Sequence, residues 1–131
     1  MIAVFEAAGC EVLDFGLATT PALFMATQFE EFACDAGIML TASHLPFYFN
    51  GIKIFSQTGG AEKSDIAYIL THTEASEAAD GSVKQADLLS RYAADLVEKI
   101  QRGSGNEQPL KGLKIVVDAG NGAGGYFADK F

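Results

Sequence analysis

Basic residues are scarce in this sequence of 131 residues. Nine lysines and arginines stand against 17 aspartates and glutamates, which gives a formal net charge of -8 and a sequence pI of about 4.5. Proteins bind nucleic-acid phosphates and anionic lipid surfaces through clustered lysine and arginine side chains, so this shortage argues against both kinds of partner. We therefore expect no nucleic-acid partner and no membrane partner.

Long apolar runs, basic leader segments and cysteines are also lacking. No apolar run approaches the roughly 20 residues that a membrane span needs, and no basic segment precedes the apolar residues of the opening MIAVFEAAGCEV, as it would in a signal peptide. The two cysteines, Cys10 and Cys34, do not have the spacing of a metal site. We therefore expect a cytoplasmic protein with two reduced, largely buried thiols.

The residues that are present favour a folded α/β domain. Hydrophobic residues make up 49% of the chain and charged residues 20%, a balance that supports a core. Residues 1–8 are typical of a helix end that Gly9 closes, and residues 11–17 (EVLDFGL) of a short strand. A helix is predicted from Thr20, as N-cap, to about Cys34.

The strand after this helix predicts a parallel arrangement. The sequence IMLT (38–41) is fully apolar, as in a strand that is covered on both faces. Strand, helix and strand then form a βαβ unit, in which the two strands run parallel. A further strand, IKIF (52–55), is predicted after a turn at Asn50 and Gly51.

The second half of the chain predicts two helices and a domain boundary. The helices lie within residues 61–80 and 86–100, the second strongly amphipathic. The polar stretch RGSGNEQP (102–109) is typical of a linker. We interpret residues 1–101 as a partial first domain, incomplete at its N-terminus, and residues 110–131 as the first strand and turn of a second domain. A partial domain exposes a sheet edge or an apolar face, so we expect some self-association.

Ser43 is the first candidate for chemistry. It follows the strand at 38–41, next to His44 and before Pro46, and a hydroxyl on a rigid strand end suits a covalent intermediate. The plain alternative is a turn serine that bonds its own backbone. A serine hydrolase is disfavoured because G-x-S-x-G is absent, because the adjacent His44 side chain should point away from Ser43, and because His72 should be solvated.

A glycine-rich turn offers a second candidate. Gly120, Gly122 and Gly125 fit the spacing G-x-G-x-x-G of a dinucleotide site. The acidic residue that binds the ribose is expected about 20 residues after these glycines, whereas Asp118 precedes them. The plain alternative is a strand-to-helix turn that needs glycine for its backbone.

The long stretch GIMLTASHLPFYFNGIKIF (37–55) resembles the active-site serine loop of the α-D-phosphohexomutases. The flanking stretches EVLDFGLATTPALFMAT and LKGLKIVVDAGNGAGG are similar to neighbouring parts of the same family. Leu45 departs from the pattern, since the family most often has asparagine there. The matching residues of the loop are Thr41, Ala42, Ser43, His44, Pro46, Asn50, Gly51 and Lys53.

The resemblance implies a mixed α/β sheet sandwiched between helices, and a phosphoryl transfer between the 1- and 6-hydroxyls of a hexose phosphate. It implies Ser43 as the phosphoryl carrier, Lys53 as general acid and base with electrostatic help, and His44 as a contact near the substrate. It also implies Mg²⁺, with a phosphoryl oxygen on Ser43 as one ligand, and hexose 1-phosphate, 6-phosphate and 1,6-bisphosphate as partners.

Several alternatives stay open. The sugar of the substrate is mannose or glucose, or, less favoured, the glucosamine type that phosphoglucosamine mutases use. The chain is alternatively an inactive remnant or an interaction fragment. The resemblance places further metal and sugar loops of the family outside these residues, so we expect the isolated chain to be inactive.

Overall fold

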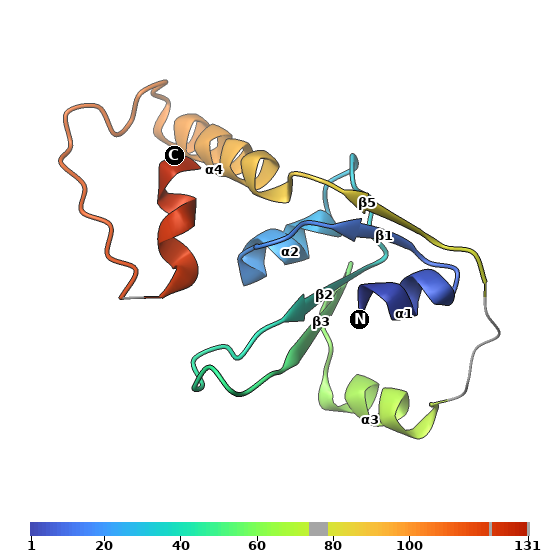
Figure 1. Cartoon of the computed structure of the whole chain (residues 1–131). Helices are drawn as coiled ribbons and strands as arrows, with labels where there is room; N and C mark the ends of the chain where they lie inside the picture. Colours follow the sequence, from blue (N-terminus) through green and yellow to red (C-terminus); the bar gives the residue numbers. More distant parts are fainter. Residues whose placement is uncertain (74–78, 121, 131) are drawn as a thin grey trace. The chain divides into compact units, whose positions relative to one another are not determined.

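The chain forms two compact units, residues 1–86 and residues 87–131, in a computed structural model that describes residues 1–73, 79–120 and 122–130. Figure 1 shows the order of the elements along the chain. The first unit holds α1 (Ile2–Ala7), β1 (Glu11–Asp14), α2 (Thr20–Ala26), β2 (Ala36–Leu40), β3 (Ile52–Ser56), β4 (Gly59–Gly60), α3 (Lys63–Thr71) and β5 (Ser82–Gln85). The second holds α4 (Leu88–Ser104) and a 3₁₀ helix, η1 (Ala123–Lys130).

The first helix ends at Gly9, as the sequence predicts. Gly9 has a φ of +81°, and its N–H donates to the carbonyl of Glu6 at 3.0 Å. The N–H of Cys10 donates to the carbonyl of Phe5 at 2.9 Å. These two bonds form a Schellman motif, in which glycine adopts the left-handed conformation without a side-chain clash.

The predicted βαβ unit is wrong in its pairing, although the mixed α/β class is confirmed. β1 pairs in parallel with β5, with Glu11 opposite Ser82 and Asp14 opposite Gln85. β2 pairs with β3 in antiparallel fashion and belongs to a separate sheet of order β2-β3-β4. β5 thus occupies the place beside β1 that the sequence predicts for β2. Two side-chain hydrogen bonds across this pair, from Lys84 to Glu11 and from Gln85 to Asp14, add to the backbone pairing.

The second helix begins one residue earlier and ends sooner than the sequence predicts. Thr19, and not Thr20, is the N-cap, because its extended backbone lets its hydroxyl oxygen accept the N–H of Ala22 at 3.2 Å. The α-helix stops at Ala26, where the hydroxyl of Thr27 donates to the carbonyl of Phe24 at 2.8 Å. The buried side chains of this part of the unit are Ala22, Leu23, Ala26, Thr27 and Phe29.

One face of the β2–β3 pair packs against α2. Residues opposite one another in an antiparallel pair share a face, so Gly37 and Phe55 lie on the same face as Met39 and Lys53. On this face the rings of Phe24 and Phe55 meet edge to face at 6.1 Å. A Cβ on Gly37 would lie 3.1 Å from Leu23 Cγ, so glycine permits the close approach of helix and strand.

The other face of β2 and β3 is less covered than the sequence predicts. Leu40 and Ile52, which are opposite one another, are 63% and 56% exposed. In the described residues no strand pairs with the outer edge of β2. The prediction of a strand covered on both faces is therefore wrong for the end of β2 that carries the loop.

Two tight turns make the connection between β2 and β3, and neither is the predicted Asn50-Gly51 turn. The N–H of Leu45 donates to the carbonyl of Ala42 at 2.9 Å, and that of Phe49 to the carbonyl of Pro46 at 2.9 Å. Gly51 closes the hairpin instead, where its carbonyl accepts the N–H of Thr41 at 3.0 Å. The turn prediction failed because a two-residue hairpin turn at 50–51 requires pairing of residues 49 and 52, whereas Ile52 pairs with Leu40.

The helix predicted within residues 61–80 is shorter in the structure. α3 ends at Thr71, with His72 as C-cap, and its apolar residues Ile66, Ile69 and Leu70 are exposed. The remainder of the prediction includes residues 74–78, which lie outside the described residues. The ring of His72 stacks on Tyr68 at 3.9 Å, so this exposed histidine contacts its own helix.

The second unit contains the strongest amphipathic helix and lacks the strand predicted at 110–117. α4 extends to Ser104, three residues into the predicted linker, and Gly105 ends it with a φ of +63°. The residues from Leu113 to Val117 form no strand, and Val116 is 85% exposed. A buried strand needs a hydrogen-bonded neighbour, and no described residue pairs with this segment. The predicted division into domains stays a prediction.

The glycines at 120–125 therefore do not follow a strand. The N–H of Gly120, which has a φ of +58°, donates to Asp118 Oδ1 at 2.7 Å, and η1 begins at Ala123. A dinucleotide site of the G-x-G-x-x-G kind is a strand–turn–helix unit. The plain reading of these glycines, a turn that needs their backbone freedom, fits the structure better.

The two cysteines differ in their burial. Cys34 is half-buried and Cys10 is exposed, and both are free thiols, so the prediction of two largely buried thiols is wrong for Cys10. Burial, with the neighbouring Asp35 carboxylate, raises the pKa of the Cys34 thiol.

Among the described residues, no helix has the length and apolar character that crossing a membrane requires.

Asp14 should make the first unit sensitive to acid. Its Oδ1 accepts the N–H of Gly16 at 2.9 Å and its Oδ2 accepts Gln85 Nε2 at 2.7 Å, and these bonds hold the pKa of the carboxyl below its usual value. A lowered folded-state pKa contributes stability above the unfolded pKa, about 3.9, and that stability is lost as the pH falls through the folded pKa.

We therefore expect Asp14→Asn to lose less stability than the wild-type chain on acidification below about pH 4. Urea unfolding between neutral and acidic pH measures this difference. Glu30→Gln, which removes an exposed carboxylate elsewhere in the unit, is the control. If the free energy of unfolding depended on pH equally in the wild-type chain and in Asp14→Asn, Asp14 would not have a lowered pKa in the folded chain.

Candidate active site

Ser43 occupies a strained backbone position in the hairpin loop between β2 and β3. Its φ is +56°, a value that costs a residue with a side chain roughly 1–2 kcal/mol. It is the first central residue of the turn from Ala42 to Leu45, and His44, the second, has no positive φ. This φ pattern fits a type II′ turn, in which glycine dominates the position of Ser43.

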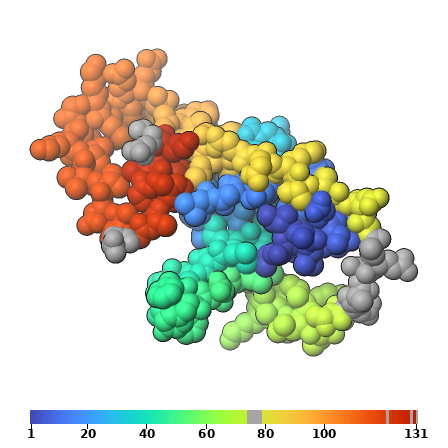
Figure 2. All heavy atoms as spheres, viewed as in Figure 1, coloured from blue at the N-terminus to red at the C-terminus, as the bar shows by residue number. Residues whose placement is uncertain are grey.

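The loop places the Ser43 hydroxyl in solvent. Ser43 and the residues after it up to Gly51 are exposed, and Phe47 is 94% exposed. In the space-filling view the teal and green atoms of this loop stand out from the rest of the first unit (Figure 2). A hydroxyl exposed in this way is accessible to a ligand, and strained positions concentrate at functional sites.

The structure brings Ser43 and His44 together, against the expectation that their side chains point apart. The distance from Ser43 Oγ to His44 Nδ1 is 3.4 Å, which is long for a hydrogen bond. Neighbouring side chains diverge in an extended strand, whereas Ser43 has a positive φ and is not extended. The contact gives the hydroxyl an imidazole nitrogen as its neighbour.

Lys53 lies on β3 and does not contact Ser43. It is half-buried and opposite Met39, on the face that packs against α2. Lys53 and Ser43 therefore have no direct contact through which one could exchange a proton with the other.

The loop is free of acidic residues, although the whole chain carries a net charge of -8. From Ala36 to Ala61 there is no aspartate or glutamate, and Lys53 is the only lysine or arginine. An anionic ligand at Ser43 therefore meets no carboxylate from its own loop. This local charge agrees with a phosphorylated ligand, which the overall composition alone does not suggest.

The same lack of carboxylates bears on Mg²⁺. Within the part of the chain that the structure describes, no group of three or more histidine, cysteine, aspartate or glutamate residues is placed to hold a metal ion. Hard cations prefer several oxygen ligands, and the unmodified loop offers none of the carboxylate kind. The described residues thus do not form a magnesium site by themselves, and only a phosphoryl group on Ser43 would add oxygens at the loop.

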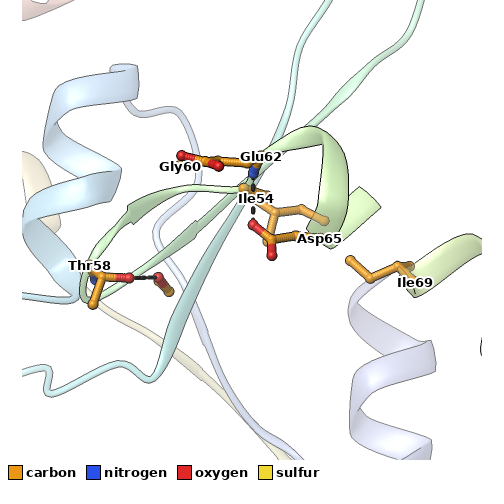
Figure 3. A pocket seen from close by; sticks show the side chains of 8 residues that line it. Ile54, Thr58, Gly60, Glu62, Asp65 and Ile69 are labelled. Atoms are coloured by element: carbon orange, nitrogen blue, oxygen red, sulfur yellow. Dashed lines mark hydrogen bonds between the residues drawn. The ribbon is translucent and has the colours of Figure 1, made fainter. Parts of the chain in front are cut away.

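A pocket of about 440 Å³ lies elsewhere in the first unit and holds none of the predicted site residues. Figure 3 shows it between the β3–β4 turn and the start of α3. The carboxylate of Asp65 accepts the N–H of Glu62 there at 2.8 Å, and the hydroxyls of Ser56 and Thr58 are 2.9 Å apart. These polar groups are engaged with one another, and the pocket does not extend the site at Ser43.

Sequence reasoning did not assign a role to Thr41. Its Oγ1 accepts the N–H of Ser43 at 2.8 Å. The signal was available, because a threonine two residues before a turn residue commonly bonds its backbone in this way.

Comparison with known proteins shows the family of the chain. The family described as phosphoglucomutase/phosphomannomutase, alpha/beta/alpha domain I, matches residues 1–80. A phosphomannomutase/phosphoglucomutase of Pseudomonas putida is 38% identical over 123 residues, which cover 92% of this chain and 25% of the relative. A probable phosphoglucosamine mutase of Methanosphaera stadtmanae is 36% identical over 132 residues, 98% of this chain and 28% of the relative.

A phosphoglucosamine mutase of Campylobacter curvus is 35% identical over 134 residues, 94% of this chain and 29% of that protein. The chain thus spans about a quarter of the length of the curated relatives that it matches. The matched family covers more than half of the chain and includes the whole loop with Ser43 and Lys53. The chain belongs to the phosphoglucomutase/phosphomannomutase family and carries its α/β/α domain I.

Proposed function

We propose that this chain is the phosphoryl-carrying part of a phosphohexomutase, in which Ser43 accepts and returns the phosphoryl group. The observation that carries the proposal is the exposed hydroxyl of Ser43 at a strained turn position, in a loop without carboxylates. A structural serine at a type II′ turn would be replaced by glycine with a gain in stability. A hydroxyl that is kept at this cost fits a role in chemistry.

The reaction consists of two transfers that mirror each other. In the first, a bond forms between phosphorus and a sugar hydroxyl oxygen while the bond between phosphorus and Ser43 Oγ breaks; the sugar hydroxyl loses its proton and Ser43 Oγ gains one. In the second, Ser43 Oγ attacks the other phosphoryl group of the hexose bisphosphate and loses its proton, while the bond from phosphorus to the sugar oxygen breaks and that oxygen gains a proton. Covalent catalysis of this kind divides one exchange into two steps.

His44 and Lys53 take different parts in this proposal. Nδ1 of His44, 3.4 Å from Ser43 Oγ, is placed to take the hydroxyl proton or return it. Lys53 does not contact Ser43, and we assign it to the sugar hydroxyl and to the charge of the phosphoryl group, as general acid and base.

Mg²⁺ remains part of the proposal through the family alone. The described residues do not hold it by themselves, so its ligands other than a phosphoryl oxygen on Ser43 come from beyond these residues. The identity of the sugar is also a proposal. The relatives include proteins named for mannose and glucose phosphates and others named for glucosamine phosphate, and we place this chain with mannose and glucose.

A chimera tests the proposed function in the context of a full-length relative. This chain replaces the matching quarter of the Pseudomonas putida protein, and the product is called the chimera below. We expect it to convert hexose 1-phosphate to hexose 6-phosphate, and Ser43→Ala to lower kcat on the order of 10⁴-fold or more, as loss of a nucleophile does in other enzymes.

Ser56→Ala is the matched control, because it removes an exposed serine hydroxyl from the strand that carries Lys53. Circular dichroism shows whether each variant is folded. Comparison of mannose, glucose and glucosamine phosphates as substrates tests the sugar. Turnover that survives in a folded Ser43→Ala chimera would rule out Ser43 as the carrier.

A further inference from the structure

Thr41 lies at the base of the loop that carries Ser43 and is bonded through both its backbone and its side chain. Its N–H donates to the carbonyl of Gly51 at 3.0 Å, which closes the hairpin one position beyond the last ladder pair, Leu40 and Ile52. Its Oγ1 accepts the N–H of Ser43 at 2.8 Å. Thr41 is half-buried, whereas Ser43 is exposed. Thr41 therefore joins the ordered end of the sheet to the strained turn.

Gly51 fixes the opposite side of this closure. A Cβ added to Gly51 would lie 3.0 Å from the carbonyl oxygen of Thr41. The two sides of the hairpin therefore approach each other there more closely than a residue with a side chain usually allows. Thr41 is consequently held from one side by the backbone of Gly51.

The bond from Ser43 to Thr41 offsets the cost of the positive φ. In the described chain only Ala33 and Ser43 have a positive φ without being glycine. Glycine would relieve the strain at position 43 but would remove the hydroxyl. A side-chain acceptor two residues earlier keeps the turn and the hydroxyl together, because it gives the N–H of Ser43 a partner in this conformation.

We propose that Thr41 is the positioning residue of the phosphoryl-transfer site, and that its hydroxyl holds Ser43 at positive φ so that the Ser43 hydroxyl is presented beside His44. This inference rests on the proposed function for its catalytic part. Without the Thr41 hydroxyl, Ser43 returns toward an extended backbone. Its Oγ then leaves the position 3.4 Å from His44 Nδ1.

The first arm of the test measures the backbone and does not depend on activity. In isotope-labelled 131-residue chain, a positive φ at Ser43 gives a strong NOE between its own amide and α protons, because these protons are closest in that conformation. We expect this NOE to weaken in Thr41→Val, which has a similar shape without the hydroxyl, and to persist in Thr41→Ser. Thr58→Val, which removes a hydroxyl from the β3–β4 turn, should leave it unchanged.

The second arm measures turnover in the chimera. We expect Thr41→Val to lower kcat about tenfold, the effect of a single hydrogen bond that positions a reacting group. Thr41→Ser should restore most of the loss, and the KM for hexose phosphate should change little. Thr41→Ala serves as the second variant if Thr41→Val is not folded.

Each outcome decides a separate point. An unchanged NOE at Ser43 in both Thr41→Val and Thr41→Ala would overturn the inference, whatever the activity. A lost NOE with unchanged kcat would show that Thr41 holds the conformation of the loop but does not position Ser43 for catalysis, which would overturn the catalytic part of the inference. A chimera with native Thr41 and Ser43 that is folded but transfers no phosphoryl group would refute the proposed function, while the NOE would still decide whether Thr41 holds the turn.

Discussion

Gly81→Ala should lower the free energy of unfolding of the first unit by about 3 kcal/mol or more. A Cβ on Gly81 would lie 2.4 Å from the carbonyl oxygens of both Cys10 and Glu6, and 2.9 Å from the Cα of Glu6. All three atoms belong to the backbone, so no side chain can rotate to make room. The substitution therefore has to push the start of β5 away from the end of α1.

The displaced strand would lose its pairing as well. The N–H of Ser82 donates to the carbonyl of Cys10 at 3.1 Å, and Ser82 is opposite Glu11 in the parallel ladder. Separation of the two strands breaks the first hydrogen bond of the β1–β5 pair, and the unpaired backbone groups lose the stabilisation that they had in the ladder. We expect the salt bridge between Lys84 and Glu11 to contribute little against this, because both side chains are exposed.

Gly103→Ala is the control for this substitution. Gly103 lies within α4, its φ is not in the left-handed region, and a Cβ there would have no neighbour within 4 Å. Alanine favours the helix over glycine by up to about 1 kcal/mol, so this variant should be slightly more stable. Urea unfolding of both variants measures the difference. A Gly81→Ala chain as stable as wild type would show that α1 and β5 are not in the described contact.

The isolated chain should show no turnover of hexose 1-phosphate to hexose 6-phosphate, even with Mg²⁺ and a hexose bisphosphate. Phosphoryl transfer depends mostly on positioning and on stabilisation of charge. Among the described residues no metal-binding cluster is present, and from Ala36 to Ala61 Lys53 is the only lysine or arginine. The exposed Ser43 would also meet water, which competes with the sugar hydroxyl for the phosphoryl group.

The chimera is the positive control for this prediction, because the relative's remaining sequence is then present. A coupled assay of hexose 6-phosphate, run on equal concentrations of chain and chimera, measures the ratio of the two rates. Turnover by the chain alone that disappears in Ser43→Ala would contradict the prediction. It would show that residues 1–131 contain all the groups that the reaction needs.

Local signals predicted the parts of the fold that depend on neighbouring residues. Gly9 closes α1 because glycine alone takes a φ of +81° without a clash. Likewise, the apolar runs at residues 38–41 and 52–55 correspond to β2 and β3. The serine loop could be placed between these strands because a long motif, and not composition, located it.

The incorrect predictions concern contacts between segments that are distant in sequence. Which strand pairs with β1 depends on residues 82–85, which show no apolar alternation that would identify them as a partner. The apolar run at residues 113–117 has the composition of a buried strand, but composition does not supply a hydrogen-bonded neighbour. Sequence patterns report the preference of a segment and not the partner that satisfies it.

The conformation of Ser43 was the least predictable feature of the site. The sequence indicates a turn, but a positive φ is rare for serine, and the usual expectation is glycine at such a position. The side-chain contact with His44 follows from that φ and was expected not to form. The bond that the N–H of Ser43 donates to Thr41 Oγ1 supports this φ, and only for this bond did the sequence carry a signal, a threonine two residues before a turn residue.

Location of the phosphate is the most direct test of Ser43 as the phosphoryl carrier. Ser43 is the only serine between Met1 and Lys53, the first lysine or arginine of the sequence, so proteolysis after Lys53 separates it from every other serine of this chain. The chimera is incubated with hexose 1,6-bisphosphate, digested and mapped by tandem mass spectrometry. We predict one phosphate on Ser43, absent in Ser43→Ala. A phosphate on another residue, with Ser43 unmodified in an active chimera, would contradict the account.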